Sequence, residues 1–311
     1  MFANRSAAGF VAIVTDSTAS LPNLTTGADY SSLLAVVPLR LLAGGLVADD
    51  GAAEAAAVEY AAARGERLTT ARPTPERFAA VYQAAADAGA RAVVSVHLPG
   101  SLSGTIASAE LAAAASAVPV HVVDAHTIGT GLGLVVLDAV RQARAGLAPD
   151  EIATRAGRYA ERLGSFFALA DQDALLAGGR LMPGGRLGPG GAPVPGGPLL
   201  AGEPAAEGRL TYRPILRISS GQIVPVERVR TMAAAADRLA ELAARFAGDE
   251  AVDLAVEHTA AASRAVELTE RLAALIPQVR RKFLVASGTA IMAHAGRGML
   301  GVTVAPRPAD G

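Results

Sequence analysis

The sequence contains no cysteine. This absence excludes disulfide bonds, a cysteine nucleophile and zinc sites built on thiolate ligands. Tryptophan is absent as well, and aromatic residues together make up only 4% of the chain. The chain therefore offers few aromatic platforms on which the bases of a nucleic acid can stack.

Charged residues are few and nearly balanced in sign. Lys and Arg number 28 against 29 Asp and Glu, which gives a formal net charge of −1 at pH 7. A protein that binds DNA or RNA typically carries an excess of basic residues, because its main contacts are with phosphates. We therefore expect no nucleic-acid partner.

Long hydrophobic runs are missing, although hydrophobic residues make up 51% of the chain. A membrane-spanning helix needs ~18 or more consecutive apolar residues, and the nearest candidate, residues 128–137, is ended by Asp138.

The first residues carry Arg5 and lead directly into a strand-like segment, unlike a signal peptide. The apolar content is ample for a folded core. We expect a globular cytoplasmic protein without stable membrane insertion.

The 311 residues are more than one typical domain contains, and the first half alternates strand-like and helix-like segments. Residues 10–15 form an apolar run typical of a strand buried on both faces. Thr74-Pro75-Glu76 marks the start of a helix, because Thr suits the N-cap and Pro the first turn. Further strands are expected at 33–42, 92–98 and 120–124, and further helices at 52–63, 105–117 and 131–145. This alternation predicts an α/β domain with a mostly parallel sheet.

The second half predicts another α/β domain, with a mixed sheet. Strands are expected at 166–170, 252–257, 283–286 and 299–304 with two more within 214–226, and helices at 150–163, 231–246 and 263–275. We place the boundary near residue 160, which gives domains 1–160 and 161–311. Gly or Pro occupies 14 of the 25 positions from Gly184 to Gly208, which excludes a regular helix or central strand there. This long loop is either a lid or binding loop, or an insertion without function.

Two hydroxyl-rich loops precede expected helices. Ser101-Leu102-Ser103-Gly104-Thr105 follows a buried strand, and Leu68–Thr74 carries further Thr residues. Hydroxyls, free backbone N–H groups and a glycine at a helix start are typical of an anion site. Each loop is also compatible with an ordinary helix cap. The interpretation as an anion site is strengthened if both loops meet at one edge of the sheet.

Two other patterns favour neither a cofactor nor a metal. Gly129-Thr130-Gly131-Leu132-Gly133 resembles a dinucleotide fingerprint, but its second interval is one residue too short and it does not follow the first strand. His121 and His126 would face opposite sides of a strand, which disfavours a shared ion. We expect no cofactor and no metal site.

Three further residues stand out by their surroundings. His294 lies in a glycine-flanked segment that we interpret as a loop before a strand, where its near-neutral pKa suits anion binding or proton handling. Arg180 follows Gly178-Gly179, and Arg230 precedes Thr231. Each of the three is also compatible with an ordinary surface residue.

Taken in order, these motifs resemble the DegV family of bacterial fatty-acid-binding proteins. The resemblance covers nearly the whole chain, from Val11 to Pro306. It rests on Val14-Thr15-Asp16-Ser17-Thr18, Thr70–Glu76, Leu102-Ser103-Gly104-Thr105, Val122-Val123-Asp124 with the Gly129/Gly131/Gly133 helix, Gly178-Gly179-Arg180-Leu181, Arg213-Pro214-Ile215-Leu216, Gly221, Val229-Arg230-Thr231, Glu257-His258-Thr259 and His294–Gly301. No single motif is diagnostic, but this many in the right order are.

The resemblance implies a two-domain α/β protein that buries one long-chain fatty acid in an apolar tunnel, with the carboxylate near the domain junction. It implies no catalysis by the chain itself. A separate fatty-acid kinase would convert the presented carboxylate to an acyl phosphate for phospholipid synthesis.

Specific residues carry over by position. Thr70, Ser103 and His294 would bind the carboxylate, with Gly104 and Thr105 in the same loop as Ser103. Arg180 and Arg230 would lie near the head group or face the kinase, and Asp16 and Ser17 would support the site.

The sequence departs from the family pattern at three places. Arg297 stands where Pro is usual, and Ala71 where Ser is usual. The glycine-rich loop is longer than expected and repeats the arginine motif as Gly184-Gly185-Arg186-Leu187, so Arg186 competes with Arg180 for the same role. We prefer Arg180, because it follows the helix-like segment 173–177.

Two alternative functions stay open. One is an α/β enzyme that acts on a small carboxylated or phosphorylated metabolite, with Asp16, His294 and the hydroxyl loops in its pocket. No nucleophile elbow supports it. The other is an interaction protein that has kept the fold and lost lipid binding. Ala71 and Arg297, which depart from the family pattern, are the reason for keeping this alternative.

Overall fold

The structure is a computed structural model that describes residues 9–22, 32–170, 186–187, 193–194 and 212–307. The chain divides into two compact units by its internal contacts. The first unit comprises residues 1–162 and 288–290, and the second comprises residues 163–287 and 291–311.

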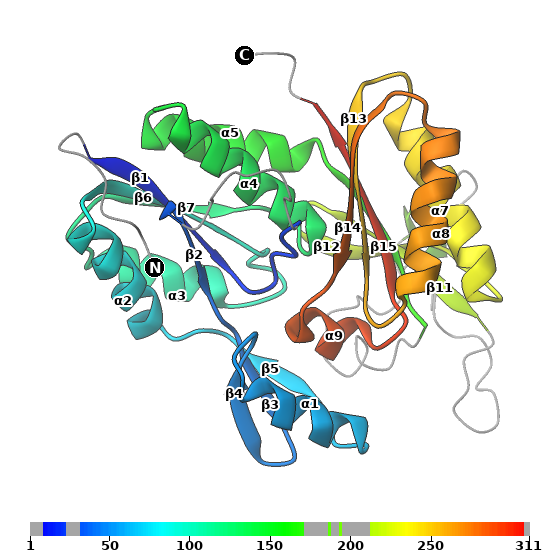
Figure 1. Ribbon diagram of the computed structural model, residues 1–311, viewed down its shortest axis with the longest axis horizontal. Helices are drawn as coiled ribbons and strands as arrows, with labels where there is room; N and C mark the ends of the chain where they lie inside the picture. The colour runs from blue at the N-terminus through cyan, green and yellow to red at the C-terminus, as the bar shows by residue number, and fades with distance from the viewer. Residues whose placement is uncertain (1–8, 23–31, 171–185, 188–192, 195–211, 308–311) are drawn as a thin grey trace. The chain divides into compact units, whose positions relative to one another are not determined.

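A four-stranded parallel sheet forms the centre of the first unit, with the strand order β2-β1-β6-β7 (Figure 1). Its strands are β1 (Phe10–Asp16), β2 (Leu34–Val37), β6 (Ala90–His97) and β7 (Val120–Asp124). Helices α2 (Pro75–Asp87) and α3 (Thr105–Ala113) cover one face, and α4 (Thr130–Arg144) and α5 (Pro149–Glu161) cover the other. β1 and β6 are therefore buried on both faces.

Apolar side chains form a core between α2 and the parallel sheet. Phe78 and Tyr82 lie one helical turn apart on α2, so both side chains face the sheet. They pack with Val14 of β1 and Val93 of β6, and all four side chains are buried. Burying each such side chain contributes about 1.5–3 kcal/mol.

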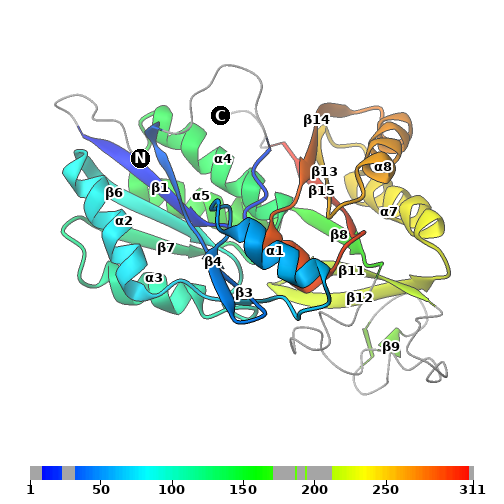
Figure 2. The same cartoon turned by 60° about the horizontal axis from the view of Figure 1, so that its bottom comes forward.

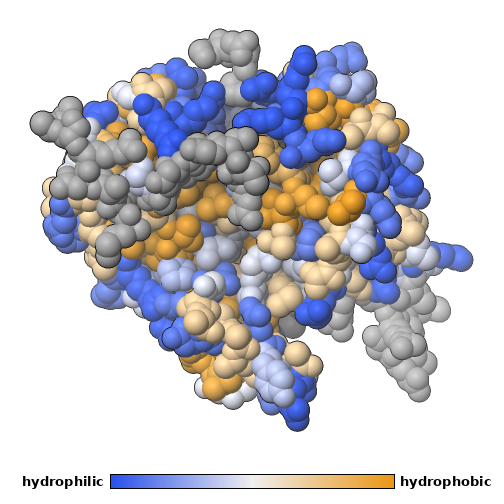
Figure 3. Space-filling model, in the orientation of Figure 1, coloured by the Kyte–Doolittle hydropathy of each residue, from blue (hydrophilic) through white to orange (hydrophobic). Residues whose placement is uncertain are grey.

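A small antiparallel sheet, with the order β4-β3-β5, lies in the same unit. Its strands are β3 (Arg40–Ala43), β4 (Leu46–Asp49) and β5 (Thr69–Ala71), and α1 (Ala55–Ala63) packs on it. Leu46, Val47 and Tyr60 are exposed there. Figure 3 shows hydrophobic and hydrophilic surface side by side over this part.

Two expectations for this region were wrong. The single strand expected at 33–42 is two strands, β2 and β3, which belong to different sheets. Pro38 lies between them and has no N–H to donate to a ladder, so the chain leaves one sheet before it enters the next. The segment expected as the loop before α2 includes β5, which pairs with β3.

A six-stranded mixed sheet forms the second unit, in the order β12-β11-β8-β15-β13-β14 (Figure 2). Its strands are β8 (Gly164–Ala168), β11 (Arg213–Ser219), β12 (Gln222–Val229), β13 (Val252–His258), β14 (Val279–Ala286) and β15 (Leu300–Pro306). Only β13 and β14 pair in parallel. Two short strands, β9 (Arg186–Leu187) and β10 (Pro193–Val194), pair with each other.

Helices α7 (Met232–Ala247) and α8 (Ala262–Leu275) pack on one face of the six-stranded sheet. Leu239 and Leu268 from these helices share a core with Leu254, Val256 and Val302. A short helix, α9 (Thr289–Ala295), connects β14 to β15 in sequence. The predicted α/β fold, with a parallel-sheet part and a mixed-sheet part, is confirmed.

Within the described ranges, no helix has both the length and the apolar character needed to cross a membrane.

Candidate functional site

The carboxyl ends of β1 and β6 lie next to each other because the two strands are parallel neighbours. Open α/β sheets place their ligands at such carboxyl ends. β1 ends at Asp16 and β6 at His97, and Oδ2 of Asp16 lies 2.9 Å from Nδ1 of His97. The same oxygen accepts the backbone N–H of Leu98 at 3.2 Å. Asp16 therefore ties the ends of the two strands together.

The residues after β1 hold the turn that follows it. Oδ1 of Asp16 accepts the backbone N–H of Thr18 at 3.1 Å and its hydroxyl at 2.5 Å. Oγ of Ser17 accepts the N–H of Leu39 at 3.1 Å, and the Ser17 side chain also hydrogen-bonds to Asp50. Burial raises the pKa of Asp50, and the bond from Ser17 opposes this change. Asp16 and Ser17 thus fix the backbone at the sheet edge.

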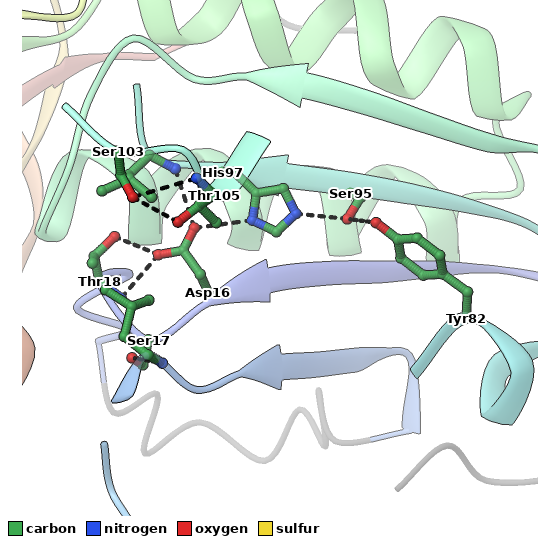
Figure 4. Close-up of polar contacts among 10 residues, drawn as sticks. Asp16, Ser17, Thr18, Tyr82, Ser95, His97, Ser103 and Thr105 are labelled. Carbon is green, nitrogen blue, oxygen red and sulfur yellow. Dashed lines mark hydrogen bonds and ion pairs between the residues drawn. The ribbon is translucent and has the colours of Figure 1, made fainter. Parts of the chain in front are cut away.

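A buried chain of polar side chains leads away from Asp16 (Figure 4). Nε2 of His97 lies 2.7 Å from Oγ of Ser95, which lies 2.8 Å from the hydroxyl of Tyr82. The distances fit one direction of donation, in which Tyr82 donates to Ser95, Ser95 donates to Nε2, and Nδ1–H of His97 donates to Asp16, so that each donor has one acceptor. Burial raises the pKa of Tyr82 to about 12, so its hydroxyl stays a donor.

The loop after β6 is held from both sides. Asp16 accepts the N–H of Leu98 on one side, and Oδ2 of Asp124, at the end of β7, accepts the N–H of Gly100 at 3.0 Å on the other. The N–H of Ser103 then bonds to the carbonyl of Pro99 at 3.2 Å. Two carboxylates from the strands flanking β6 thereby fix the segment that carries the hydroxyls.

Ser103 and Thr105 form a hydroxyl pair at the start of α3. Their oxygens lie 2.9 Å apart, and Oγ of Ser103 also accepts the backbone N–H of Thr105 at 3.3 Å. Thr105 is buried and Ser103 is half-buried. If the buried hydroxyl donates to Ser103, the hydroxyl hydrogen of Ser103 remains for an acceptor outside the loop. This is a suitable arrangement for an anionic oxygen.

The loop after β5 reaches the same place. A Cβ atom built on Gly104 would overlap with the guanidinium of Arg72 and lie 3.0 Å from its Cδ atom. Gly104 therefore leaves the space that the Arg72 side chain occupies. Thr70 lies in β5, pairs with Leu41 and is half-buried. The two hydroxyl-rich loops of the sequence thus meet through Arg72 and Gly104.

The glycine pattern at the start of α4 has a packing role. The N–H of Gly129 donates to the carbonyl of Thr18 at 3.0 Å, and the N–H of Ser20 donates back to Gly129 at 3.1 Å. A Cβ atom on Gly133 would overlap with the carbonyl oxygen of Ser20. These glycines let α4 approach the turn after β1, which accounts for their presence without a dinucleotide.

His294 belongs to the second unit and lies in the last turn of α9. The interpretation of this segment as a loop was therefore wrong for His294 itself, because the helix continues to Ala295 and the loop begins at Gly296. His294 is half-buried.

The predicted arginines are described only in part. Arg230 is exposed directly after β12, and Arg297 is exposed after α9. Arg180 lies outside the described residues, and Arg186 is the first residue of β9. The choice between Arg180 and Arg186 therefore stays a prediction.

Sequence reasoning missed several of these groups. Ser95 and His97 had a signal, since two polar residues spaced by two in an apolar strand share one face. Asp50 and Arg72 had none, because their partners come from distant segments. Within the described part of the chain, no cluster of three or more His, Asp or Glu side chains is arranged to hold a metal ion.

The sequence profile of the DegV family, described as a family of uncharacterised proteins, matches residues 10–192 and 202–307. A DegV domain-containing protein of Streptomyces coelicolor is 38% identical over 299 residues, which cover 96% of this chain and 99% of that protein.

Two solved structures share the fold. A DegV family protein from Thermus thermophilus, described as binding fatty acid, has a TM-score of 0.79 at 26% identity and covers 96% of this chain and 100% of its own. DegV of Bacillus subtilis, described as a fatty acid binding protein, has a TM-score of 0.77 at 24% identity, with coverage of 96% and 100%. With its sequence profile, relatives and fold in agreement, this chain belongs to the DegV family.

Proposed function

We propose that this chain binds one long-chain fatty acid and that the Ser103 hydroxyl donates a hydrogen bond to its carboxylate. The observation that carries this proposal is the hydroxyl pair of Ser103 and Thr105: Oγ of Ser103 accepts the backbone N–H of Thr105, and a hydroxyl bond donated by the buried Thr105 leaves the Ser103 hydrogen for an acceptor outside the loop. Support for the ligand class comes from the Thermus thermophilus relative, which is described as binding fatty acid.

The chemistry of a fatty acid fits such a site. A carboxylate removed from water needs hydrogen-bond donors, and a short hydroxyl supplies one without a strong ion pair that would trap the ligand. Thr70 and His294 are proposed as further donors on the basis of the family resemblance. The tail needs only apolar surroundings, since each buried methylene contributes about 0.8 kcal/mol.

We further propose that a separate fatty-acid kinase acts on the bound ligand. A carboxylate oxygen would attack the γ-phosphorus of ATP, and ADP would leave, so that an acyl phosphate forms for phospholipid synthesis. The kinase and its ATP supply this chemistry, and the present chain supplies the positioned carboxylate. Arg180 and Arg230 are proposed to stabilise the added negative charge or to contact the kinase.

An enzyme acting on a small metabolite is less well supported. Asp16, His97 and Ser95 are spaced like an acid, a histidine and a hydroxyl nucleophile, with contacts of 2.9 and 2.7 Å. However, all three side chains are fully buried, and Ser95 is also bonded to Tyr82. A substrate carbonyl cannot reach this hydroxyl, so the chain of groups is better explained as support for the sheet edge.

Native mass spectrometry of the protein purified without detergent tests the ligand. We expect a bound mass in the fatty-acid range, and a rise in melting temperature with one or more acids between lauric and arachidic acid. An unliganded mass together with no thermal shift across this series would overturn the proposal.

The kinase step needs a separate assay. The protein, palmitate, ATP and the fatty-acid kinase of the same genome are combined, and acyl phosphate is trapped with hydroxylamine. We expect hydroxamate only when all four components are present, and reduced yield with Arg230→Ala at unchanged palmitate binding. Hydroxamate formed without this chain would contradict its presenting role.

A further inference from the structure

The motif Glu257-His258-Thr259 has no role in the site described above, yet it lies at the end of β13, next to both ends of the segment that carries His294. On the near side of α9, the N–H of Ser287 donates to the carbonyl of His258 at 2.9 Å, and the Ser287 hydroxyl donates to Oε2 of Glu257 at 3.2 Å. The start of the segment is thereby tied to β13.

Thr259 ties down the far side of α9. Its hydroxyl donates to the carbonyl of Gly296 at 2.5 Å and accepts the N–H of Met299 at 3.0 Å. Its backbone N–H donates to the carbonyl of Met299 at 3.2 Å, and its carbonyl accepts the N–H of Gly298 at 2.6 Å. One residue, 1% exposed, thus makes four hydrogen bonds to the loop after α9.

These contacts bear directly on His294. The N–H of Gly296 donates to the carbonyl of Met292 at 2.9 Å, so the residue that Thr259 holds also closes the last turn of α9, where His294 lies. Gly296 and Gly298 have φ values of +71° and +87°, a backbone that glycine adopts readily. The helix α9 has only seven residues and lies between Gly288 and Gly296, so it is too short to be stable without its tertiary contacts.

We propose that Thr259 is a positioning residue that fixes His294 for contact with the carboxylate of the ligand. This inference rests on the proposed fatty-acid binding and on the donor role of His294. Thr259 need not touch the ligand. Its hydroxyl holds the loop that ends α9, and through this loop it sets the place and orientation of the imidazole.

Two variants separate the hydroxyl from the bulk of the side chain. Thr259→Val keeps the shape and loses the hydroxyl, whereas Thr259→Ser keeps the hydroxyl. Thr303→Val is the matched control, because Thr303 is also buried in this sheet and its hydroxyl lies 3.1 Å from Oγ of Ser165 on β8. Thr259→Ala removes the same hydroxyl with less bulk and replaces T259V if that variant does not fold.

The readouts are the affinities for palmitate and for hexadecanol, which has the same tail without a carboxylate, and the NMR titration of the His294 imidazole. We expect T259V to weaken palmitate binding about tenfold, as the loss of one hydrogen bond to a charged group does. Hexadecanol binding should stay within about twofold, and the His294 resonances should move. T259S and T303V should resemble the wild type in all three.

Several outcomes would overturn the inference. These are wild-type palmitate affinity in T259V, an equal loss for palmitate and hexadecanol, or the same loss in T303V. If the wild type binds neither ligand, the proposed function fails instead. The His294 resonances then decide about Thr259 alone, since unmoved resonances in T259V would refute its positioning role.

Discussion

Asp16 and His97 form a fully buried pair, with 2.9 Å between Oδ2 and Nδ1, at the carboxyl ends of two neighbouring parallel strands. The pair does more than join β1 to β6. The remaining bonds of Asp16 run to Thr18, the second residue after β1, and to Leu98, the first residue after β6. One carboxylate therefore links the ends of both strands to the loops that follow them.

Replacing that carboxylate should destabilise the first unit. In Asp16→Asn, an amide NH₂ takes the place of one acceptor oxygen and faces either the donor groups of Thr18 or those of His97 and Leu98. We expect the free energy of unfolding to fall by about 1–3 kcal/mol, because a buried hydrogen-bonding group is left without its partner. Urea unfolding measures this change. Asp87→Asn, at an exposed carboxylate that accepts from Gln83, is the control and should change little.

Removing the Ser103 hydroxyl should weaken binding of the fatty-acid head group. We expect Ser103→Ala to raise the dissociation constant for palmitate about tenfold, because the carboxylate loses a charged hydrogen bond. Isothermal titration gives this value, and circular dichroism should show an unchanged fold. Ser101→Ala, at an exposed position of the same loop, should bind like the wild type. Equal affinities for both variants would rule out Ser103 as the donor.

Arg72 should add an electrostatic contribution at the same place. Its guanidinium lies against Gly104, and among the described residues no carboxylate lies within 4.0 Å of it. We expect Arg72→Gln to weaken palmitate binding by a factor of about 3 at low salt and less at high salt, since an exposed cation is screened. Arg155→Gln, at an exposed arginine paired with Glu151 on α5, controls for the change in net charge. A loss independent of salt would contradict an electrostatic role.

His258 should make stability depend on pH. Burial lowers the pKa of His258 from 6.5, and its Nδ1 accepts the N–H of Ala261 at 3.2 Å. The imidazole of the unfolded chain therefore binds a proton more readily than that of the folded chain. The stability that neutral His258 contributes is fully present above pH 6.5, and it is lost as the pH falls through the lowered pKa of the folded state.

The test compares the wild type with His258→Asn, whose side-chain oxygen can still accept from Ala261. Between pH 7 and pH 5, the wild type should lose stability relative to the variant, by at most about 1.4 kcal/mol for each unit of pKa change. Urea unfolding at the two pH values measures the difference. Parallel stability curves for the two proteins would show that His258 is not responsible.

Local signals were sufficient to predict most elements of this fold. Thr74-Pro75-Glu76 predicted the beginning of α2 at the correct residue, because N-cap and first-turn preferences act within a few neighbouring positions. The apolar run of β1 likewise predicted a strand buried on both faces. The same kind of reasoning found Ser103 and Thr105, whose pairing depends only on their spacing at a helix start.

The sequence by itself thus determined the order of strands and helices, the α/β class and the hydroxyl loop at the start of α3. Tertiary structure alone decided that Pro38 separates two sheets, that residues 69–71 become a strand, and that His294 lies in a helix. It also decided the chain from Asp16 through His97 to Tyr82, whose members come from three elements. The reason is physical: short strands, a seven-residue helix and buried polar groups are stable only with partners that lie far away in the sequence.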